Sequence, residues 1–185
     1  MDVLIPALIA ILLSETGGKT QNFALAHAMA GQGKTGVIAL ILSSLLVYGA
    51  AAVGGTLIGP MIPLEARSLM VAVALLAAGV PMVIKARAAP ALPAPPSLIR
   101  SAFGFTTTQF GDGAQFLVFA LAARGTSPGF AMAGALLGVT ASALLPAMMG
   151  KDWPQGSLIT GLRMTAGALL SVAGFVMAIS ALQLI

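Results

Sequence analysis

Long apolar segments are the feature that most restricts the fold of this chain. A helix needs about 20 predominantly apolar residues to cross the hydrocarbon core of a bilayer, and this 185-residue sequence contains several such runs. Only 8% of its residues are charged, whereas the surface of a soluble domain normally carries about a quarter or more. We therefore predict an all-α integral membrane protein, and we exclude a soluble enzyme, a nucleic-acid-binding module and a disulfide-stabilised secreted domain.

Six segments are predicted as transmembrane helices. They cover approximately residues 3–29, 36–58, 66–84, 98–123, 128–149 and 160–185. Polar, glycine-rich stretches interrupt the first and the fourth segment, at residues 14–22 and 106–115 respectively. Residues 85–97 contain four prolines and two cations, which predicts a linker because proline cannot continue a helix.

The two halves of the chain share one pattern. A shift of 94 residues places residues 15–21 on residues 109–115. Each half then contains a broken helix, a helix rich in small residues and a plain helix, which divides the chain into repeats 1–84 and 98–185 around the linker 85–97. Because each repeat has three spans, the second must enter the membrane from the opposite side. This inverted repeat is typical of secondary transporters.

The basic residues predict the orientation in the membrane. One predicted side holds Lys34, Lys85, Arg87, Arg100, Lys151 and Arg163, and the other holds Arg67 and Arg124. By the positive-inside rule the first side is cytoplasmic. This places the linker inside and both termini outside, and the alanine-rich composition favours a bacterial inner membrane.

Polar residues at the predicted centre of the interrupted segments are the candidate functional residues. Glu15 and Gln109 fall near the middle of their segments, and Asp112 follows closely. A carboxylate at that depth costs at least ~2.5–3.5 kcal/mol to insert, so it must face protein, water or an ion. By their spacing, positions 15, 18 and 19 share one helical face, as do positions 109, 112 and 113.

The chemistry of these residues indicates a hard cation. Carboxylate and amide oxygens are ligands that Ca²⁺ and Mn²⁺ accept, and the sequence has no Cys to provide thiolate. We therefore predict a metal site formed by Glu15, Asp112 and Gln109. Supporting or gating roles are predicted for five neighbours: Lys19, Thr20, Gln115, Gly17 and Gly111.

The two interrupted segments resemble the motifs of the Gdt-type (transmembrane protein 165-like) cation transporters of the Golgi and of bacteria. In that family, each of two inverted three-helix halves carries Glu-x-Gly-Asp-(Lys/Arg)-(Ser/Thr). Four motif positions are retained in the first copy here: Glu15, Gly17, Lys19 and Thr20, with Gly18 in place of the Asp. Two are retained in the second copy: Gly111 and Asp112, with Gln109, Gly113 and Ala114 at the Glu, basic and hydroxyl positions.

The resemblance implies a secondary transporter that moves Mn²⁺, or alternatively Ca²⁺, in exchange for protons, with the motif carboxylates as ligands. Intact motifs provide four carboxylates and two cations, whereas Glu15, Asp112 and Lys19 together carry a formal charge of −1. Less negative charge weakens the attraction for a divalent ion. Three outcomes are therefore open: a weaker divalent transporter, a transporter of a monovalent or small cation, and a chain without transport.

Other interpretations stay open beside transport. Glu15 and Lys19 also have the spacing of a structural ion pair on one helix. The chain is alternatively a transport-inactive paralogue that acts as a membrane partner subunit, and homodimers are compatible with either interpretation. Catalysis is not expected, because intramembrane aspartyl proteolysis needs two aspartates that share a proton, and Asp2 and Asp152 lie at predicted membrane edges. We predict no cofactor.

Overall fold

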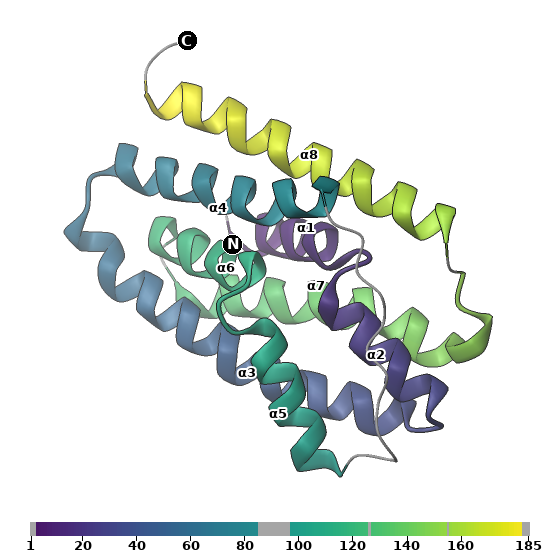
Figure 1. The fold of residues 1–185 in the computed structure, drawn as a ribbon. Helices are drawn as coiled ribbons and strands as arrows, with labels where there is room; N and C mark the ends of the chain where they lie inside the picture. Colours follow the sequence, from purple (N-terminus) through teal and green to yellow (C-terminus); the bar gives the residue numbers. More distant parts are fainter. Residues whose placement is uncertain (1–2, 85–96, 126, 155, 183–185) are drawn as a thin grey trace.

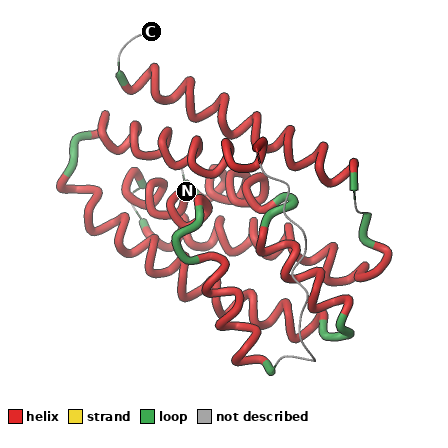
Figure 2. Tube along the Cα trace, in the orientation of Figure 1, coloured by secondary structure: helices red, strands yellow, loops and turns green. Residues whose placement is uncertain are grey.

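The structure is a computed structural model that describes residues 3–84, 97–125, 127–154 and 156–182. Within these ranges every regular element is a helix (Figures 1 and 2). The α-helices are α1 (Leu4–Glu15), α2 (Lys19–Met29), α3 (Gly33–Ile58), α4 (Leu64–Ile84), α5 (Leu98–Gln109), α6 (Gly113–Arg124), α7 (Pro128–Met149) and α8 (Ser157–Ala181). Two short 3-10 helices, η1 (Gly59–Met61) and η2 (Gly150–Asp152), follow α3 and α7. The predicted all-α class is thus confirmed for the described residues.

Four helices are long and apolar enough to cross a membrane. With their 3-10 extensions they are Gly33–Met61, Leu64–Ile84, Pro128–Asp152 and Ser157–Ala181. They correspond to the second, third, fifth and sixth predicted segments, and they are compatible with a multi-pass membrane protein. Residues 85–96 of the predicted linker lie outside the described residues, so the linker and the orientation that depends on its cations stay predictions.

The two interrupted segments each form a pair of short helices, α1 with α2 and α5 with α6. The interruptions are narrower than predicted, because only residues 16–18 and 110–112 leave the helices. These helices have 11 or 12 residues. At 1.5 Å per residue each is about 18 Å long, which is shorter than the roughly 30 Å hydrocarbon core. A single helix of a pair therefore cannot cross a bilayer.

The short helices pack against the long ones. Figure 1 shows α4 and α8 side by side along one edge, where they make extensive contact. Helix α1 packs mainly on α7, while α5 and α6 both pack on α3, and α3 packs on α7. Helices α1 and α6 also touch each other. The first interruption therefore lies among packed helices, where Gly17 is buried, whereas Phe110 and Gly111 of the second interruption are exposed.

Small residues allow the helices to approach closely. A Cβ atom at Gly134 of α7 would lie 2.2 Å from the Leu4 carbonyl oxygen of α1, and one at Gly138 would lie 2.7 Å from the Leu8 carbonyl oxygen. Gly55 makes a similar approach between α3 and α6. Packing of this kind between small residues replaces the hydrophobic effect as the main source of helix association in lipid.

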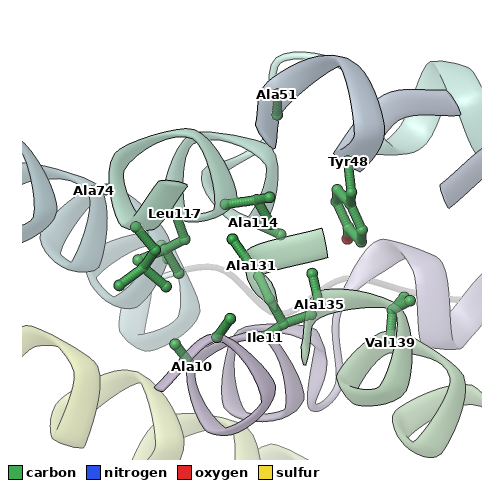
Figure 3. Close-up of a cluster of buried hydrophobic side chains, with 14 of the residues drawn as sticks. Ala10, Ile11, Tyr48, Ala51, Ala74, Ala114, Leu117, Ala131, Ala135 and Val139 are labelled. Atoms are coloured by element: carbon green, nitrogen blue, oxygen red, sulfur yellow. The ribbon is translucent and has the colours of Figure 1, made fainter. Parts of the chain in front are cut away.

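The interior is rich in alanine, whereas large apolar side chains face outward. Figure 3 shows Ala10, Ala114 and Ala135 inside the buried cluster. In contrast, Leu46 and Phe175 are exposed over more than half of their surface. Such outward-facing large side chains are unfavourable in water but not in hydrocarbon. The distribution of side-chain sizes therefore agrees with a lipid-facing surface.

We expect Gly134→Ala to destabilise the fold, because its methyl group meets a backbone carbonyl that cannot move aside. Overpacking of this kind costs about 1–3 kcal/mol. The matched control is Gly161→Ala on α8, where an added Cβ has no neighbour within 4 Å. The thermal midpoint of the purified protein in detergent should fall for the first variant and stay constant or rise for the second. Equal midpoints would contradict the close α1–α7 contact.

Candidate functional site

The two interruptions have the same backbone conformation. Gly17 has a φ of +63° and Gly111 a φ of +72°, both in the left-handed region that favours glycine. The residues before them, Thr16 and Phe110, have φ and ψ of −63° and 115°, and of −67° and 127°. The residue after each glycine is extended. This local agreement matches the shift of 94 residues seen in the sequence.

A glutamine side chain closes each interruption in the same way. The backbone N–H of Gly17 donates to Oε1 of Gln21, and that of Gly111 donates to Oε1 of Gln115, both at 2.7 Å. Nε2 of Gln21 also donates to the Ser142 carbonyl oxygen at 2.7 Å, which ties α2 to α7. The structure thus gives Gly17, Gly111 and Gln115 a role in forming the turns.

Glu15 is the last residue of α1, and only 2% of its surface is exposed. The hydroxyl group of the fully buried Tyr48 on α3 donates to Oε1 of Glu15 at 3.3 Å. Figure 3 shows Tyr48 pointing from α3 into the buried cluster. The carboxylate at the end of the broken helix is therefore held inside the protein, as the sequence predicts for an acid that avoids lipid.

Gln109 occupies the equivalent position at the end of α5, and it is also buried. Its Nε2 donates to Oγ of Ser44 on α3 at 2.8 Å, whereas its Oε1 has no hydrogen-bond partner among the described residues. Ser44 and Tyr48 are four residues apart and share a face of α3. Helix α3 therefore brings the ends of the two broken helices, Glu15 and Gln109, to one surface.

Asp112 precedes α6 and is partly buried, and its side chain makes no capping hydrogen bond. It lines a cavity of about 50 Å³. Ser14, Gly18 and Arg163 are among the other residues that line this cavity. Glu15 is not itself a lining residue, but a Cβ atom at Gly18, which does line the cavity, would lie 3.2 Å from Oε2 of Glu15. Tyr48 interacts electrostatically with both Glu15 and Asp112. The two predicted carboxylates therefore belong to one region.

The prediction that positions 15, 18 and 19 share one helical face is wrong, and so is the same prediction for positions 109, 112 and 113, because α5 ends at Gln109 and α6 begins at Gly113. Helix α1 ends at Glu15 and α2 begins at Lys19, so the helical spacing between the two residues does not exist. Lys19 is exposed whereas Glu15 is buried. Thr20, in contrast, is fully buried, and its Oγ1 has no hydrogen-bond partner in the described part of the chain.

Arg163 is the residue of this region that the sequence analysis placed elsewhere. It was expected among the cytoplasmic cations, but it lies on α8 with 6% of its surface exposed. Its Nη2 donates to the Pro81 carbonyl oxygen of α4 at 2.9 Å. Its Cβ and Cδ lie 3.0 Å from where a Cβ of Gly17 would be. Arg163 is the fourth residue of the predicted segment 160–185, a position typical of a membrane-edge cation, so no local signal indicated its burial.

The donor set restricts which ion this region can hold. Among the described residues, no three His, Cys, Asp or Glu side chains come together in a metal-binding group. A bound cation would therefore combine the two carboxylates with amide, hydroxyl or carbonyl oxygens, which suits a hard ion. No protein-family model, curated protein or solved structure matches this chain. Fold and composition alone define its class, an all-helical chain compatible with multi-pass membrane insertion.

We expect Gly17→Ala to be more harmful than Gly111→Ala. Both substitutions force a side chain into left-handed backbone, which costs about 1–2 kcal/mol. Only the methyl group at position 17 also meets Arg163, since a Cβ at Gly111 has no neighbour within 4 Å. Thermal midpoints in detergent, compared with wild type, would measure the difference. A larger loss for Gly111→Ala would contradict the placement of Arg163.

Proposed function

We propose that the protein is a secondary transporter that exchanges a divalent cation for protons. Mn²⁺ is the first candidate and Ca²⁺ the second, as the resemblance to the Gdt-type transporters implies. The observation that carries the proposal is the pair of broken helices with one conformation: Asp112 of the second break lines a small cavity, and Gly18 of the first break, which also lines it, lies against Glu15. Two carboxylates beside one cavity in an apolar interior are the arrangement expected for an ion pathway.

Two buried oxygens support the same interpretation. Oε1 of Gln109 and Oγ1 of Thr20 lack hydrogen-bond partners among the described residues. A buried polar atom left without a partner costs about 1–3 kcal/mol, so each such atom calls for an explanation. A cation bound between the broken helices would use these oxygens together with Glu15 and Asp112. The cavity of about 50 Å³ exceeds the ~10–15 Å³ that one water molecule needs.

In this proposal each pair of short helices crosses the membrane as one broken span. Together with the four long helices they form two inverted repeats, and the repeats move against each other to give alternating access. When the cation leaves, two carboxylates remain beside the cavity. A proton bound in its place limits the charge that must cross the membrane, which couples cation movement to proton movement in the opposite direction.

We expect Glu15→Gln and Asp112→Asn each to reduce Mn²⁺ flux at least ~10-fold, because each removes a unit of negative charge from a site of low dielectric constant. Flux into proteoliposomes with an internal pH dye would measure both cation and proton movement. The matched controls are Glu65→Gln and Asp152→Asn, which neutralise exposed acids away from the cavity. They should keep wild-type flux.

Wild-type flux in both Glu15→Gln and Asp112→Asn would contradict the proposed site. Wild-type protein that moves neither Mn²⁺ nor Ca²⁺ would contradict the proposed function, and it would favour the transport-inactive partner subunit. A pH change that accompanies Mn²⁺ entry in wild type, and disappears with Mn²⁺ flux in the two variants, is the result that the proposal requires.

A further inference from the structure

Arg163 is the one cationic side chain that is buried in the described part of the chain. It extends from α8 to the first interruption, where its aliphatic stem lies against Gly17. It also lines the cavity that Asp112 lines. Because an arginine side chain keeps its proton even inside proteins, a permanent positive charge lies beside the candidate cation site.

The guanidinium group has an anchor at the end of α4. It donates to the carbonyl oxygen of Pro81, and α4 ends at Ile84. The last four carbonyl groups of a helix lack partners within the helix, and they form the negative end of its dipole. Arg163 is therefore stabilised by an acceptor outside the carboxylate pair, so its charge can stay inside the protein when the carboxylates bind a cation.

Among the described residues, no arginine packs against the glycine of the second interruption. A Cβ atom at Gly111 would have no neighbour within 4 Å, in contrast to the contact between Gly17 and Arg163. Arg67, which corresponds to Arg163 at a shift of 96 residues, donates instead to the Ile62 carbonyl oxygen at 3.0 Å. The stem of the buried arginine thus packs against the first interruption, while the cavity that Arg163 lines reaches the second interruption at Asp112.

We propose that the positive charge of Arg163 competes with the transported cation for the two carboxylates. Arg163 thereby determines which ionic charge the site binds. This inference rests on the proposed transport function. Glu15, Asp112 and Arg163 together carry a formal charge of −1, which a divalent ion turns positive. The repulsion between Arg163 and the ion keeps divalent affinity low and makes release easier. Removal of the arginine charge leaves two carboxylates for the ion.

Mn²⁺ binding to purified protein in detergent, read from the EPR signal of free Mn²⁺, tests this role. We expect Arg163→Gln and Arg163→Met to lower the Kd for Mn²⁺ at least ~10-fold. The glutamine keeps a donor for Pro81, and the methionine keeps the stem against Gly17, so the two variants disturb the fold differently. Arg163→Lys keeps the charge and should stay closer to wild type. Arg67→Gln removes the corresponding charge elsewhere and is the matched control.

The outcomes separate this inference from the proposed function. If the wild-type protein and the folded variants Arg163→Gln and Arg163→Met bind Mn²⁺ with the same Kd, the proposed role of Arg163 is wrong. The proposed transport site is not affected by that result. An equal gain in affinity in Arg67→Gln also overturns the role of Arg163, because the effect would then follow net charge. Absence of Mn²⁺ and Ca²⁺ binding in wild type and in all variants overturns both proposals.

Discussion

A helix that breaks inside an apolar interior must find new partners for its freed peptide groups, and the rest of this structure depends on how that is done twice. At each break a glycine takes a left-handed conformation, and its N–H group donates to a glutamine four residues later, Gln21 or Gln115. An unpaired N–H at the buried Gly17 would cost about 1–3 kcal/mol, whereas Gly111 is exposed. The satisfied turn fixes the end of the preceding helix, so Glu15 and Gln109 meet α3 at Tyr48 and Ser44.

The two halves share this turn conformation but differ in the side chains next to the turn. The first break presents Glu15 beside Arg163, whereas the second presents Gln109 with Asp112 after it. Each half therefore contributes one acid, from opposite ends of equivalent turns. The equivalent turns therefore provide one carboxylate that lines the cavity, Asp112, and one that lies against its lining residue Gly18, Glu15, although each motif copy is incomplete by comparison with the Gdt-type pattern.

Much of the fold follows from local sequence, and much of the site does not. Apolar run length predicts the four long helices, and clustered glycine and polar residues predict where the other two segments break, because both signals are local. The width of the breaks depends on the hydrogen bonds of Gln21 and Gln115 to the turn glycines. Helical spacing does not predict these bonds, and for this reason Lys19 was wrongly expected on the same helical face as Glu15. The position of Arg163 depends on packing of α8 against Gly17, residues separated by most of the chain. No local pattern encodes such a contact, and the position of Arg163 near the start of its apolar segment is equally typical of a membrane-edge cation.

The location of a bound ion is the most direct test of the central claim that both breaks build one cation site. Crystals of the wild-type protein grown with Mn²⁺ would show the ion by anomalous scattering. The account predicts an anomalous peak at the cavity between the breaks, with carboxylate oxygens of Glu15 and Asp112 as direct ligands. Mn²⁺ bound only at surface acids such as Glu65 or Asp152, with this cavity free of anomalous signal, would contradict it.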